Sequence, residues 1–155
     1  MHLLTTDATA GPKPGSAGAI VLGLFRILVG LSFTVHGLST LFGKPTPPLG
    51  GHTAEFPNWP NWWAGAIELV AGALVALGIG TRIAALLCSG AMAYAYLFVH
   101  LRHGVLPIDN GGETAVLFCW SFFLIAIIGP GSFALGALIP HIGIKHAPRM
   151  ASTHG

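Results

Sequence analysis

Two side chains that can exchange protons, Glu68 and His36, lie inside long apolar stretches of the chain. Glu68 interrupts WWAGAIELVAGALVALGIG, residues 62–80, which is otherwise composed mostly of small and apolar residues. A charged side chain at the centre of a bilayer costs about 2.5–3.5 kcal/mol on insertion scales, so Glu68 requires a partner inside the protein. Ionisable residues within the membrane usually mark functional sites. We therefore predict that Glu68 and His36 form one unit and are the catalytic residues.

Three further ionisable residues are candidates for cofactor binding. Arg26 shares the apolar stretch of His36 but lies deeper, where binding of helix carbonyls or snorkelling is an alternative role. His100 ends one apolar stretch and Glu113 begins the next. An interfacial imidazole is the alternative for His100. For Glu113 the alternative is a capping arrangement, with Asn110 as the N-cap and Glu113 three residues later.

The composition places these residues in a membrane. Of the 155 residues, 53% are hydrophobic and only 8% are charged, and the mean hydropathy is +0.73. A soluble domain carries about 25% charged residues, so this chain cannot cover a water-facing surface. The net charge of +2 is too small and too dispersed to indicate nucleic-acid binding. No second domain and no water-soluble catalytic module are expected.

Four apolar stretches predict an all-α membrane protein, a bundle of four transmembrane helices. They cover residues 19–42, 62–77, 83–101 and 113–128. Crossing about 30 Å of hydrocarbon takes about 20 helical residues, so the second and fourth helices need extra turns at the interface. The predicted organisation is a mobile tail at 1–18, a membrane domain at 19–131, and a short interfacial segment with a C-terminal tail at 132–155.

The basic residues predict the orientation, and the orientation predicts depth. With both termini inside, the inner side holds Lys13, Arg82, Lys145 and Arg149, and the outer side holds Lys44 and Arg102, a modest positive-inside bias. His36 and Glu68 then each lie about 9 Å below the outer boundary at 1.5 Å per residue. His100 and Glu113 lie on the same side, so each helix contributes one ionisable residue to the outer half. We expect a multi-pass protein of a bacterial or archaeal plasma membrane.

Small residues predict which helix faces meet. Gly65, Glu68, Gly72 and Ala76 lie on one stripe of the second helix, and Gly23, Gly30 and Gly37 recur at intervals of seven in the first. Small residues let membrane helices approach closely, so Glu68 should point into the bundle. The polar residues Ser32, His36, Ser39 and Thr40 form an adjacent strip. The short turn at 78–81 predicts an antiparallel hairpin of the second and third helices.

The cysteines and histidines give no sign of a disulfide, metal or haem site. The predicted boundaries separate Cys88 and Cys119 by about 10 Å in depth, beyond the limit of about 7 Å between the Cα atoms of a disulfide. The Glu-x-x-His motif of di-iron bundles is absent. The spacing of His36 and His100 does not require a haem. We therefore expect no haem, flavin or metal.

Several short motifs, taken in order, resemble the DoxX/DoxD family of small four-helix membrane proteins. They are Arg26 with His36-Gly37, Glu68 followed by GIGTRIAA at 78–85, GGE at 111–113, and GPG at 129–131. The resemblance covers residues 20–131. The family takes its name from subunits of an archaeal thiosulfate:quinone oxidoreductase, so the resemblance implies a redox-linked membrane subunit. The chain departs from the family pattern at two places. Family members often carry a lysine shortly after the His-Gly pair, where this chain has Thr40. Their Gly-Pro-Gly segment tends to continue into Ser-Leu-Asp, where this chain has SFALG at 132–136.

These observations predict a subunit of a quinone-linked oxidoreductase. A quinone, the candidate cofactor, needs an apolar slot for its ring and proton-exchanging partners for its carbonyls, which His36 and Glu68 would supply. Electrons would come from other protein subunits of a membrane redox complex. Two alternatives stay open: a non-catalytic subunit that stabilises a larger membrane assembly, and a small-solute or proton pathway through the same residues. Whether the chain is itself an enzyme is also left open.

Overall fold

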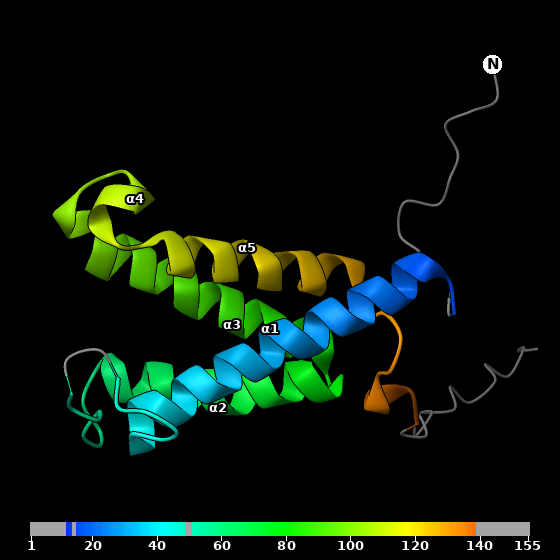
Figure 1. The fold of residues 1–155 in the computed structure, drawn as a ribbon, viewed down its shortest axis with the longest axis horizontal. Helices are drawn as coiled ribbons and strands as arrows, with labels where there is room; N and C mark the ends of the chain where they lie inside the picture. Colours follow the sequence, from blue (N-terminus) through cyan, green and yellow to red (C-terminus); the bar gives the residue numbers. More distant parts are fainter. Residues whose placement is uncertain (1–11, 14, 49–50, 139–155) are drawn as a thin grey trace, which may run out of the picture.

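The computed structural model describes residues 12–13, 15–48 and 51–138. The tails predicted at the two ends fall mostly on residues 1–11 and 139–155, outside this part. Within it all regular elements are helices. Four long helices pack alongside one another (Figure 1): α1 (Ala17–Phe42), α2 (Asn61–Leu77), α3 (Thr81–Ala95) and α5 (Glu113–Ile128). These agree closely with the four predicted apolar helices.

Four short elements complete the described chain. The π-helix η1 (Tyr96–His100) and the 3-10 helix η2 (Leu101–His103) continue α3, and α4 (Pro107–Asn110) precedes α5. The 3-10 helix η3 (Leu135–Leu138) follows α5 in the segment predicted to be interfacial. The sequence pattern predicted neither the π-helical turn nor α4.

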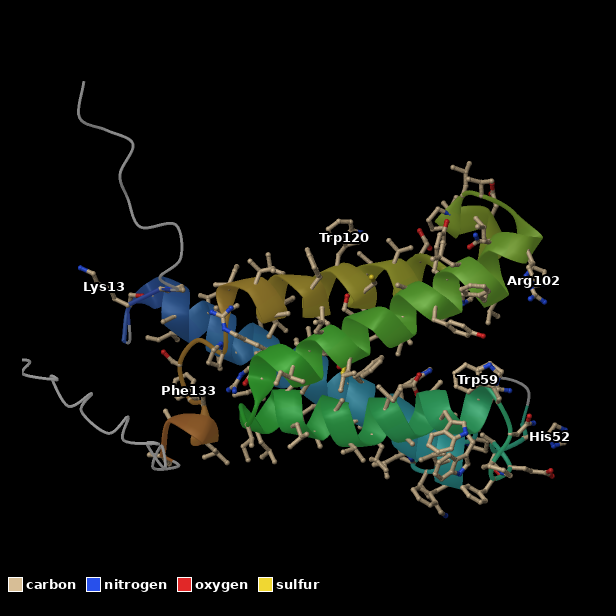
Figure 2. The ribbon with its side chains drawn as sticks, turned by 180° about the vertical axis from the view of Figure 1, so that it is seen from behind. Lys13, His52, Trp59, Arg102, Trp120 and Phe133 are labelled. Atoms are coloured by element: carbon tan, nitrogen blue, oxygen red, sulfur yellow. The ribbon has the colours of Figure 1, made fainter. Side chains whose placement is uncertain are left out.

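Two of the long helices are suited by length to crossing a membrane. They are Ala17–Phe42 and the continuous stretch Thr81–His103, whereas α2 and α5 are shorter, with 17 and 16 residues. Large apolar side chains point outward along the helices: Leu28 is 67% exposed, Ile83 74% and Trp120 66%, and Figure 2 shows Trp120 pointing away from the ribbon. Soluble monomers rarely expose apolar surface on this scale, so it suits contact with lipid.

The helices α1 and α2 are in backbone contact through glycines. A Cβ on Gly37 would overlap the Leu69 nitrogen, and one on Gly30 would lie 2.6 Å from the Ala76 nitrogen. From the other side, a Cβ on Gly72 would lie 3.0 Å from the Thr34 nitrogen. The small residues therefore have the role predicted for them, because only glycine permits this approach.

Glycine also ends the two helices at the turns. Gly43 after α1 has φ 65° and donates its N–H to the Ser39 carbonyl, while Gly78 after α2 has φ 76°. Both are left-handed C-caps, a conformation that other residues rarely adopt. The turn at Gly78 reverses the chain into α3, which confirms the predicted hairpin.

An apolar core joins the α1–α2 pair to the α3–α5 pair. Phe33 is fully buried, with its ring centroid 4.7 Å from that of Phe122 and 5.3 Å from that of Phe118. The fully buried side chains around them are Val75, Ala85, Cys88 and Ile125. This layer lies in the middle of the helices and separates the two ends of the molecule.

The side chain of Arg82, at the start of α3, caps the C-terminus of α5. Its Nη1 donates to the carbonyls of Ala126 (3.0 Å) and Ile127 (2.7 Å), and its Nη2 donates to that of Ile128 (3.3 Å). The last carbonyls of a helix have no partner within the helix, and a cation there also interacts favourably with the helix dipole. Arg82 therefore ties α3 to α5.

Replacing Arg82 by glutamine should lower the free energy of unfolding by about 1–2 kcal/mol, since one side chain satisfies three carbonyls. Lysine at this position should retain part of the effect. Thermal unfolding of the purified protein in mild detergent measures the loss. Arg102→Gln is the matched control, because Arg102 is exposed in η2. Equal effects of the two changes would contradict the capping role.

The two cysteines lie closer in depth than predicted. Ser89, the neighbour of Cys88, has its Oγ 2.9 Å from the Cys119 carbonyl oxygen and 3.6 Å from Cys119 Sγ. The predicted separation of about 10 Å by helix rise is wrong, because the helix continuing α3 extends past the start of α5: Gly112 lies against the Tyr96 ring. Both thiols are nonetheless free.

Candidate functional site

Two connecting segments lie at the same end of the molecule, which we call the loop end: the first comprises residues 43–48 and 51–60, and the second residues 101–112. Figure 2 shows His52, Trp59 and Arg102 at this end and Lys13 and Phe133 at the opposite one. The ring of Trp59 contacts that of Tyr94, with centroids 5.7 Å apart. The candidate site lies between this end and the apolar core.

Glu68 and His36 lie side by side, on α2 and α1. The distance from His36 Nε2 to Glu68 Oε1 is 3.9 Å. The two differ in exposure, because the side chain of Glu68 is 5% exposed and that of His36 is 62% exposed. The structure thus places the pair together and turns Glu68 inward, as predicted. Their catalytic role stays a prediction.

Thr40 is a second polar neighbour of Glu68. Its Oγ1 lies 3.5 Å from Glu68 Oε2 and donates to the His36 carbonyl at 3.0 Å, one helical turn back. The sequence had placed Thr40 on the polar strip of α1 without assigning it to the site. Its spacing of four from His36 was the available signal, since residues at i and i+4 share a helix face. Thr40 is also where the chain departs from the family pattern.

These side chains line one cavity of about 410 Å³, which we call the central cavity. Its polar lining residues are His36, Thr40, Asn61, Glu68, His100 and Thr114, and its apolar ones include Phe33, Met92 and Phe118. All four long helices and η1 contribute to the lining. A largely apolar cavity of this size with a few converging polar groups is typical of small-molecule sites.

The loop end holds His100 on the wall of the central cavity. His100 Nδ1 lies 3.1 Å from the backbone carbonyl oxygen of Asn110. A carbonyl oxygen only accepts, so Nδ1 carries the proton in this contact and Nε2 is left free. Asn110 is itself buried, donating to the Gly104 carbonyl at 2.7 Å and accepting from the Gly112 nitrogen at 2.7 Å. His100 therefore lines the site from a fixed position.

Glu113 does not lie with the other ionisable residues that were predicted to meet in the outer half of the bundle. It is exposed in the first turn of α5 and is absent from the lining of the central cavity. The capping arrangement predicted for it is wrong as well: the N-cap of α5 is Gly112, and the side chain of Asn110 binds the Gly112 nitrogen instead. The reason is α4, which places Asn110 in a separate turn before the helix.

Arg26 lies far from the central cavity. It is fully buried near the end opposite the loop end, ten residues from His36, about 15 Å along α1 by the helix rise. Its Nη2 donates to the carbonyls of Ser132 (3.4 Å) and Phe133 (3.1 Å) in the segment after α5. The structure therefore separates Arg26 from Glu68 and gives it contacts with carbonyls of the non-helical segment after α5, rather than with the helix carbonyls expected as an alternative.

Known proteins match most of this chain. The DoxX family model matches residues 21–101. An uncharacterized protein of Haemophilus influenzae is 38% identical over 117 residues, covering 74% of this chain and 87% of the relative. The putative oxidoreductase CatD of Bacillus subtilis is 28% identical over 116 residues, covering 75% of this chain and 84% of the relative. No solved structure matches significantly. The chain therefore belongs to the DoxX family of membrane proteins.

Proposed function

We propose that the chain is the quinone-binding membrane subunit of a redox assembly and that the central cavity is the binding site. The observation that carries this proposal is the pair of Glu68 and His36, 3.9 Å apart, on the wall of a largely apolar cavity of about 410 Å³. The relative CatD, a putative oxidoreductase, supports a redox role.

The lining suits the two parts of a quinone head group. Phe33, Met92 and Phe118 offer an apolar surface for the ring, and the polar wall offers hydrogen-bond partners for its oxygens. A bound quinone would supply two-electron, two-proton chemistry between its oxidised and reduced forms. Glu68 would hold or release a proton at its carboxyl oxygens and His36 at Nε2. Electrons would pass to or from another subunit of the assembly.

The same proposal places the chain in the membrane. All four long helices would cross the plasma membrane of a bacterium or archaeon, with the loop end on the outer side and both termini on the inner side. Lys13 and Arg82 lie at one end, and Lys44 and Arg102 lie at the loop end. Short helices of 16 and 17 residues can cross with flanking turns at the interface.

The test compares a glutamate that lines the central cavity, Glu68, with one that does not, Glu113. Glu68→Gln should weaken binding of decylubiquinol, the reduced form of the quinone, about tenfold, which corresponds to about 1.4 kcal/mol, because a hydroxyl of the quinol loses its charge-assisted hydrogen bond to the carboxylate. Glu113→Gln should leave binding unchanged, since Glu113 is exposed and does not line the cavity. Quenching of tryptophan fluorescence in lipid nanodiscs measures the affinity. Equal affinities of the two variants would refute the assignment of the site, and failure of the native chain to bind would favour a non-catalytic stabilising subunit.

A double-mutant cycle tests whether Glu68 and His36 act as one unit. Changing Glu68 and His36 to glutamine, singly and together, should give a coupling of about 0.5–1 kcal/mol in both thermal stability and ligand affinity. A value at the low end of the range of about 0.5–3 kcal/mol for residues in contact is expected because His36 is 62% exposed and the two side chains are 3.9 Å apart, so the contact is loose. Strict additivity in both measurements would show that the two side chains are independent.

A further inference from the structure

A second cavity lies at the loop end, next to the central cavity. Its volume is about 440 Å³, and we call it the vestibule. Its lining includes His52, Thr53, Glu55 and Asn58 from the loop segment, together with Thr40 and Asn61. Figure 2 shows His52 at the tip of this end. Six of its eight lining residues carry polar side chains, so the vestibule suits water.

The two cavities share a wall. Thr40 and Asn61 line both the vestibule and the central cavity. The backbone holds this wall in place, because the Ala54 nitrogen donates to the Thr40 carbonyl at 2.8 Å and Ser39 Oγ donates to the Thr46 carbonyl at 2.8 Å. The loop segment is thereby fixed to the end of α1.

The hydroxyl of Thr40 is placed to serve both protonation states of Glu68. It lies within reach of two acceptors, the His36 carbonyl at 3.0 Å and Glu68 Oε2 at 3.5 Å, and while it donates to the first its lone pairs can accept from a protonated carboxyl group. After rotation the same hydroxyl can donate to an ionised carboxylate, because a hydroxyl has one donor and two acceptor positions. Around Glu68 the other ionisable groups are His36 on α1, His100 on η1 and the buried thiol of Cys88 on α3.

The way to the opposite end is closed by apolar side chains. Phe33, Val75 and Phe122 are fully buried and lie between the pair and Arg26. A proton crosses such a layer only along polar groups or water, and the buried hydroxyl of Ser89 beside Cys88 is engaged by the Cys119 carbonyl at 2.9 Å. Glu68 therefore has polar neighbours in the direction of the loop end.

We propose that Glu68 exchanges protons with water in the vestibule through the hydroxyl of Thr40, and that Asn61 orients the water at the shared wall. In the outward step the Thr40 hydroxyl turns from the His36 carbonyl toward a water molecule in the vestibule, and the Glu68 carboxyl then gives its proton to Thr40 Oγ1 as the hydroxyl passes its own proton to that water. One proton moves from Glu68 to water and Thr40 is unchanged. This proposal rests on the proposed function and adds a proton route from the quinone site to the loop end alone. It is incompatible with a proton pathway through the whole molecule.

The test measures proton exchange of Glu68 without any quinone. The carboxyl band that disappears in Glu68→Gln identifies Glu68 in infrared spectra of the protein in lipid, and its response to deuterated buffer gives the exchange rate. Thr40→Val should slow this rate about tenfold or more, and Thr40→Ser should restore it. Thr34→Val is the matched control, because Thr34 also donates to the carbonyl one turn back, at 2.8 Å from Gly30. A native rate in Thr40→Val would overturn the proposal.

A second measurement leaves Thr40 in place. A bulky polar maleimide on Thr53→Cys, in a background with Cys88→Ala and Cys119→Ala, should fill the vestibule and slow the exchange of Glu68. The same label on Val105→Cys, which is 76% exposed on the other connecting segment, should not. Equal rates in both labelled proteins would refute the route. If the label on Thr53→Cys slows the exchange but the native chain binds no quinone, the route stands and the proposed function is refuted. Failure of the route and failure of the proposed function are therefore distinguishable.

Discussion

Gly37→Ala is expected to destabilise the protein by about 2 kcal/mol or more, within or above the usual cost of overpacking. The added methyl group would overlap the backbone nitrogen of Leu69 and lie 2.8 Å from the Gly65 carbonyl oxygen. Backbone atoms within a helix cannot change conformation as a flexible side chain can, so α1 and α2 must move apart to accommodate the methyl group. The separation falls beside His36 and Glu68, and we expect quinone binding to be lost together with stability.

The control for this change is Gly90→Ala in α3. A Cβ on Gly90 meets no atom within 4 Å, and alanine favours a helix over glycine by about 1 kcal/mol, so stability should be unchanged or slightly higher. Thermal unfolding in mild detergent, with the quinone-binding measurement on the same samples, separates the two variants. Stable protein with native affinity in Gly37→Ala would show that the α1–α2 contact is looser than described.

The helices could be predicted from the sequence because the signals for them are local. The apolar run that predicts α5 has the same bounds as the helix, 113–128. Glycine at 43 and 78 ends α1 and α2 in the left-handed conformation. The orientation of Glu68 followed from the small residues on its stripe. Each of these inferences depends on residues within a few turns of one another.

The relative heights of α3 and α5 could not be predicted, because they depend on a non-local arrangement. The π-helical turn η1 and the helix η2 carry α3 past the start of α5, and Asn110 fixes the returning segment through Gly104 and Gly112. This shift explains why Cys119 lies level with Ser89 and why Glu113 misses the cavity. The cap supplied by Arg82 was missed for the same reason, since its partners are 44–46 residues away.

Arg26 differs from Glu68 in what offsets its burial. It is 0% exposed, and its Nη2 binds two carbonyls of the segment after α5, whose backbone is also held by Ser132 N donating to the Ala19 carbonyl at 2.8 Å. Gly78 leaves room for the guanidinium, because a Cβ there would overlap Nη1. The Gly136 nitrogen donates to the Gly78 carbonyl at 3.1 Å. Arg26 thus joins α1, the α2–α3 turn and the segment 129–138.

Arg26→Leu should therefore lower the free energy of unfolding by about 3 kcal/mol, since two hydrogen bonds from a charged donor are lost and each such bond contributes about 1.5–3 kcal/mol. The free energy of unfolding of Arg26→Lys should lie between those of the native protein and Arg26→Leu, because an ammonium group keeps the charge but cannot present the same planar set of donors. Limited proteolysis should show cleavage within 129–138 appearing first. Quinone affinity at the central cavity, measured below the unfolding temperature, should stay native, because Arg26 is about 15 Å from His36 along α1. Affinity that falls in Arg26→Lys while the protein stays folded would return Arg26 to the binding site.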